Sequence, residues 1–119
     1  MTNEELQRRL STLQEQAWAI MPEGQAFENQ PPLHPKTKFG SELATDLGRL
    51  AGALSAFAAS GEKGLGLRQC VNFEAGRLLL GVSYAEGRVL RGELVIDQHL
   101  TTEVAGAVGD ALKIVAAEK

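Results

Sequence analysis

The feature that most constrains the fold is an apolar seam within residues 42–60, ELATDLGRLAGALSAFAAS. Its large apolar side chains recur at alternating intervals of four and three residues: Leu43, Leu47, Leu50, Leu54 and Phe57. This spacing places all of them on one face of an α-helix, so it predicts a long helix that packs against a core. We expect Ser41 to cap this helix and Gly61 to end it.

A second stripe of the same helix carries only small residues at four-residue intervals: Ala44, Gly48, Gly52 and Ala56. Each glycine inside a helix costs about 1 kcal/mol relative to alanine. A second backbone that approaches closely over the missing side chains would offset this cost. The stripe by itself leaves two alternatives open, namely packing within the domain and packing across a dimer.

Apolar periodicity also predicts a helix at each end of the chain. The first lies within residues 1–16, with Thr2 or Asn3 as its cap, and the last follows Thr101 or Thr102. Their apolar faces comprise Leu6, Leu10, Leu13 and Ala17 in the first helix, and Val104, Val108, Ala111, Leu112 and Val115 in the last.

The remaining segments are typical of strands and a loop. Short apolar strands at 17–21 and 25–28 flank a Pro-Glu-Gly turn and indicate a β-hairpin, and a proline-rich loop is expected over 29–40. The run after the long helix alternates apolar and polar residues around two glycine-containing turns, EAGR (74–77) and AEGR (85–88). It predicts three antiparallel strands, near 66–74, 77–84 and 88–96.

The predicted order is thus helix, two strands, long helix, three strands, helix. It favours one α+β domain over residues 1–119, a five-stranded antiparallel sheet with helices on its faces.

Neither composition nor motifs indicate an enzyme. The net charge of −3 gives no general attraction to nucleic acid or to an anionic membrane, and a single cysteine excludes a thiolate metal cluster. The glycines of SGEKGLG (60–66) follow a helix, whereas a phosphate-binding loop precedes one. We therefore expect no catalytic, cofactor or metal site and no nucleic-acid or membrane partner. The charged N-terminus is not typical of a signal peptide, so we expect a cytoplasmic protein.

The element order, the alanine-rich long helix and the strands after it resemble the roadblock (dynein light-chain) family over about residues 17–115. The resemblance implies a roadblock/profilin-like fold and a non-enzymatic scaffold that forms dimers, here a homodimer. It also implies that the dimer binds a Ras-like small GTPase and in some cases modulates GTP hydrolysis.

On this sequence the resemblance implies that strand 67–73 joins two sheets while the small stripes of two long helices meet. The implied dimer interface comprises Ala44, Gly48, Gly52, Ala56, Leu67, Gln69, Val71 and Phe73. One alternative is a secretion-type chaperone that holds a client strand on its sheet edge, which the pI of about 5.4 suits. Another is a domain that encloses a small ligand, although an aromatic content of 5% argues against a dedicated pocket.

Overall fold

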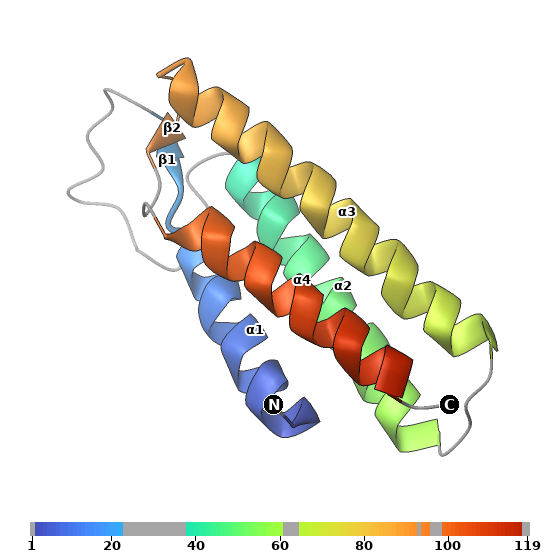
Figure 1. The fold of residues 1–119 in the computed structure, drawn as a ribbon. Helices are drawn as coiled ribbons and strands as arrows, with labels where there is room; N and C mark the ends of the chain where they lie inside the picture. The colour runs from blue at the N-terminus through green and yellow to red at the C-terminus, as the bar shows by residue number, and fades with distance from the viewer. Residues whose placement is uncertain (1, 23–37, 61–64, 93, 96–98, 118–119) are drawn as a thin grey trace.

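The computed structural model describes residues 2–22, 38–60, 65–92, 94–95 and 99–117. This part of the chain contains four helices: α1 (Asn3–Trp18), α2 (Lys38–Ser60), α3 (Leu65–Leu90) and α4 (Leu100–Ala117). Each helix runs antiparallel to the next one along the chain (Figure 1). α1 and α3 each pack against both α2 and α4. The described residues therefore form an up-and-down four-helix bundle.

Two short strands tie the helix connections together at one end of the bundle. β1 (Met21–Pro22) pairs antiparallel with β2 (Leu94–Val95), with Met21 opposite Val95 (Figure 1). Within the described residues this is the only sheet, and each strand has two residues. The predicted five-stranded antiparallel sheet, and with it the α+β roadblock-like fold, is therefore wrong.

The largest error concerns the three strands predicted at 66–74, 77–84 and 88–96, because one continuous helix, α3, occupies residues 65–90. Its buried side chains follow alternating intervals of four and three residues: Val71, Ala75, Leu78, Val82 and Ala85. This is the seam of a helix that packs in a bundle. Two of its five members are alanines, so the seam is weakly marked in the sequence.

The glycines that suggested turns lie inside α3. Gly76 and Gly87 keep helical backbone angles, whereas Gly92 is the one described glycine with a positive φ, at 74°. Gly92 follows the helix and donates its N–H to the carbonyl of Val89, at 3.0 Å. The end of α3 is thus set by a left-handed glycine.

The other predicted helices are confirmed, with different boundaries. α2 begins at Lys38, so Ser41 lies inside the helix and does not cap it. α4 begins at Leu100, ahead of both threonines predicted as caps, and its first turn bonds back to His99. Residues 17–18 belong to α1 rather than to a strand. The predicted strand 25–28, the loop up to residue 37 and Gly61 lie outside the described residues.

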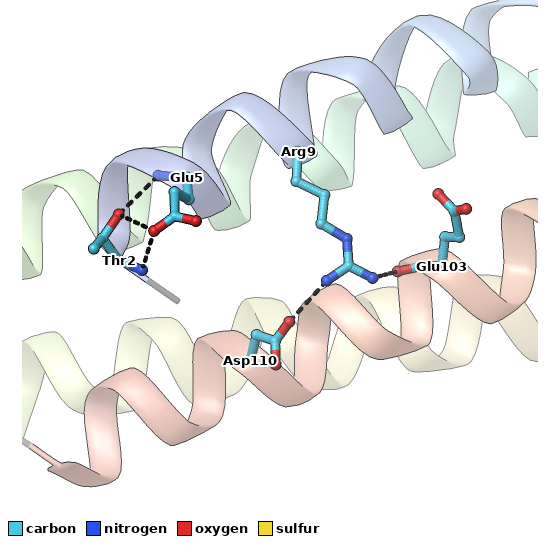
Figure 2. Close-up of polar contacts among 5 residues, drawn as sticks. All are labelled: Thr2, Glu5, Arg9, Glu103 and Asp110. Atoms are coloured by element: carbon cyan, nitrogen blue, oxygen red, sulfur yellow. Dashed lines mark hydrogen bonds and ion pairs between the residues drawn. The ribbon is translucent and has the colours of Figure 1, made fainter.

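Thr2 caps α1, as the sequence predicts. Its hydroxyl accepts the Glu5 N–H at 3.1 Å, while the Thr2 N–H donates to a Glu5 carboxylate oxygen at 3.2 Å (Figure 2). This reciprocal pair is a capping box. The backbone bond, followed by the bond from the Thr2 hydroxyl, holds the pKa of the exposed Glu5 carboxyl below its ordinary value.

Buried apolar side chains from all four helices form one cluster, which includes every large side chain of the seam in residues 42–60. Side-chain amides on one face of α1 add a row of hydrogen bonds to α2. Asn3, Gln7 and Gln14 donate to the carbonyls of Leu54, Ala51 and Ala44 at 3.4, 2.9 and 2.9 Å. The row follows the antiparallel course of the two helices.

Arg68 links the ends of three helices. Its guanidinium donates to the carbonyl of Val115 near the end of α4, at 2.7 Å, and lies 5.7 Å from the centre of the Phe57 ring on α2. A cation at a helix C-terminus satisfies a carbonyl that has no partner within the helix. The contact of Arg68 with Phe57 holds the start of α3 beside α2, next to the groove described below.

Candidate interaction surface

The small stripe of α2 divides between the core and the surface. Ala44 is buried, and a Cβ atom added at Gly48 would stand 2.9 Å from Nε2 of Gln14 on α1. Gly52 and Ala56 are exposed, and no atom lies within 4 Å of a Cβ added at Gly52. Half of the stripe therefore packs within the bundle, and the other half faces outward.

Gly52 and Ala56 line a groove of about 540 Å³ between α2 and α3. Leu67, Cys70 and Phe73 of α3 form much of its opposite side. The two small residues leave space that larger side chains would fill, and the lining of the groove is mostly apolar. Two side chains of opposite charge, Arg49 on α2 and Glu74 on α3, also border this groove.

A smaller hollow of about 180 Å³ continues along the same two helices. Asp46 borders it from α2, and Arg77, Leu80 and Tyr84 border it from α3. Nε of Arg77 lies 3.7 Å from Oδ1 of Asp46 across the hollow, and the same guanidinium lies 5.9 Å from the centre of the Phe73 ring. The hollow is therefore more polar than the groove beside it.

Three large apolar side chains of α3 project from this surface. Phe73, Leu80 and Tyr84 are 62%, 64% and 66% exposed. Their spacing of seven and four residues keeps them on one face of α3, opposite its buried seam. We call this surface the α2–α3 face; it comprises Asp46, Arg49, Gly52 and Ala56 of α2, and Cys70, Phe73, Glu74, Arg77, Leu80 and Tyr84 of α3. Exposed apolar side chains rimmed by charges are typical of a protein-binding surface.

The predicted interface residues of the segment 67–73 lie on a helix, so their role as a joining strand is wrong. Val71 is part of the core, whereas Leu67, Gln69 and Phe73 line the groove with Gly52 and Ala56. The structure thus brings five of the eight predicted interface residues together. Whether they form an interface stays a prediction.

Sequence reasoning missed Leu80 and Tyr84. The prediction of strands at 66–74 and 77–84 places Phe73 in a different strand from Leu80 and Tyr84, whereas on the helix α3 all three share a face. The heptad interval from Phe73 to Leu80, and again from Arg77 to Tyr84, is the signal that could have identified this surface.

The described residues include no group of three or more His, Cys, Asp or Glu side chains placed to hold a metal ion. Cys70 has an exposed free thiol. No helix in the described ranges combines the length and apolar character needed to cross a membrane.

Comparison of the chain with protein-family models, with curated proteins and with solved structures found no match. The resemblance to the roadblock family therefore rests on the sequence pattern alone, and the bundle is not the fold that the family implies.

Proposed function

We propose that this protein is a non-enzymatic scaffold whose α2–α3 face binds an amphipathic helix of a partner protein. The observation that carries this proposal is the row of Phe73, Leu80 and Tyr84, each about two-thirds exposed beside an apolar groove. Removing apolar surface from water contributes about 25 cal/mol per Å², so three such side chains favour a bound state over an exposed one.

The shape and charge of the face define the partner's chemistry. A helix that packs on such a face fits a ridge of its side chains into the recesses of the surface it covers. The partner helix should present apolar residues at intervals of three, four and seven. It should carry both acidic and basic residues along its flanks, because Asp46 and Glu74 alternate with Arg49 and Arg77 along the face.

This proposal keeps the scaffold function expected from the sequence, but assigns the binding surface to two helices instead of a sheet edge. A client strand added to a sheet edge, as the chaperone alternative requires, has only the two-residue strands β1 and β2 to pair with in the described residues. The small GTPase stays a prediction of the family resemblance, because no contact in the bundle tests it.

Selection of displayed helical peptides against the folded protein tests the proposal. Peptides enriched on the wild type should share apolar residues with helical spacing and should lose binding to Leu80→Glu. They should still bind Ser11→Glu, a matched change at an exposed residue of α1, which packs against α2 and α4. Enriched peptides that bind Leu80→Glu as well as the wild type would show that the α2–α3 face is not the binding surface.

A further inference from the structure

We propose that the helix bound by the α2–α3 face belongs to a second copy of this chain, so that two bundles pair about a two-fold axis parallel to their helices. This inference rests on the proposed function and names its partner. A surface that pairs with itself must offer each protruding group a matching recess at the same position along the axis. The α2–α3 face meets this condition in its shape and in the arrangement of its charges, and the helix pair that carries it is long enough for a stable interface.

The shape is complementary because a protruding aromatic side chain and a recess share one level of the bundle. Phe73 of α3 lines the same groove as Gly52 and Ala56 of α2. A two-fold axis along the groove keeps every residue at its level and places α3 of one copy over α2 of the other. Phe73 of each copy then faces the partner's small residues, where an added Cβ at position 52 meets no atom within 4 Å.

The direction of the helices also suits this pairing. α2 and α3 are antiparallel within one bundle (Figure 1), so α3 of one copy is antiparallel to the α2 that it covers in the other. An axis perpendicular to the helices would instead stack α3 on α3. It would set protruding side chains such as Phe73 and Leu80 against each other and leave the recess at Gly52 empty. Close packing of interfaces favours the parallel axis.

The charges of the face cancel level by level. Asp46 and Arg77 lie at one level, with 3.7 Å between Oδ1 of Asp46 and Nε of Arg77. Arg49 and Glu74 border the groove, at the next level. The parallel two-fold axis doubles each pair and yields two clusters, each with two carboxylates and two guanidiniums. Glu42 also borders the smaller hollow and adds a carboxylate there. Apart from it, each cluster holds equal numbers of carboxylates and guanidiniums, which favours pairing of two identical faces.

The helix pair that carries the face is long enough for a stable interface. The 26 residues of α3 extend about 39 Å at 1.5 Å per residue. Two helices packed 8–10 Å apart cover a strip about 20 Å wide, so the α2–α3 pair along its full length, with the face in its middle part, offers roughly 780 Å². Specific protein interfaces bury about 800 Å² on each partner.

The single cysteine of the chain reports on this arrangement. Cys70 is exposed and lines the groove, so a two-fold axis along the groove places the two Cys70 thiols close to each other. Treatment of the full-length protein with a short bismaleimide should give a covalent dimer. That product should be lost in Leu80→Glu and kept in Ser11→Glu. A double variant, Cys70→Ser with Thr102→Cys, moves the cysteine to an exposed position on α4 and should give no covalent dimer.

Sedimentation equilibrium of the same samples completes the test. A wild-type dimer whose Cys70 thiols do not cross-link would overturn the parallel axis. A wild-type monomer would overturn the second copy as partner. If that monomer still binds selected helices through Leu80, the proposed function stands and only the self-pairing fails; if it binds none, both fail.

Discussion

The guanidinium of Arg9 on α1 lies over Gly106 of α4, where an added Cβ atom would stand 2.9 Å from Nη2. From this position Nη1 lies 2.7 Å from an Asp110 carboxylate oxygen, and Nη2 donates to the Glu103 carbonyl at 3.3 Å (Figure 2). The missing side chain at Gly106 thus makes room for a polar clamp between the first and last helices.

We expect Gly106→Ala to reveal this clamp through a double-mutant cycle with Arg9→Ala. Without Arg9, alanine should raise the free energy of unfolding by about 1 kcal/mol, the difference in helix propensity. With Arg9 present the gain should be smaller, because the guanidinium must shift and a part-exposed ion pair is worth about 0.2–1 kcal/mol. Urea unfolding measures both values. Gly109→Ala is the control, since no atom lies within 4 Å of its added Cβ; equal gains at Gly106 in both backgrounds would rule out the clamp.

Two glycines of the α3 segment should respond to alanine in opposite directions. Gly76 is exposed within the helix and its added Cβ meets nothing within 4 Å, so Gly76→Ala should stabilise the protein by about 1 kcal/mol. Gly92 has a φ of 74°, so Gly92→Ala should destabilise it by about 1–2 kcal/mol. Thermal and urea unfolding provide the comparison. Destabilisation by Gly76→Ala would indicate a turn at 74–77 and contradict a continuous α3.

The Glu5 carboxyl should titrate below the ordinary value for glutamate, about 4.3, because the Thr2 N–H and hydroxyl donate to its charged form. Since the folded pKa is the lower one, the capping box stabilises the fold above the unfolded pKa. That contribution is lost as the pH falls through the folded pKa. Carboxyl chemical shifts in NMR should show the lowered midpoint. Thr2→Ala should raise the midpoint only in part, because alanine removes the hydroxyl and keeps the backbone N–H. A wild-type midpoint at the ordinary glutamate value would show that the capping bonds do not form in solution.

Helices α1, α2 and α4 could be predicted from the sequence because each has a buried seam of large side chains beside a mostly polar or small-residue face. Leu6, Leu10 and Leu13 are all buried, as their spacing predicts. In α3 the buried seam includes Ala75 and Ala85, while larger side chains such as Phe73 and Leu80 are exposed. Apolar residues therefore occur on both the buried and the exposed side of α3, and the helical period of its buried seam is hidden in the sequence.

The interaction surface was only partly predictable for the same reason. The small stripe predicted the close approach of a second backbone, whereas a Gln14 side chain lies over Gly48 and no atom lies within 4 Å of a Cβ added at Gly52. Gly52 and Ala56 nevertheless lie on the α2–α3 face. The α3 side of this face could not be predicted from the sequence, because a strand prediction over 66–84 does not bring Arg77 and Tyr84 beside α2. They lie beside α2 only because α3 is a helix. Gly76 and Gly87 were the misleading signals, since glycine suits a turn and is also tolerated on an exposed helix face.

The pairing of two α2–α3 faces is tested most directly by exchanging the charges at Asp46 and Arg77. Asp46→Arg puts four guanidiniums into the paired cluster and Arg77→Asp puts four carboxylates there, so each variant alone should be monomeric in sedimentation equilibrium. Mixed in equal amounts, they should form a one-to-one dimer, because two guanidiniums of one copy then meet two carboxylates of the other. Glu15→Arg and Arg8→Asp are matched control changes at exposed residues of α1. Each of these two control variants should remain a dimer. Dimers of Asp46→Arg and Arg77→Asp alone, as stable as that of the wild type, would contradict the pairing.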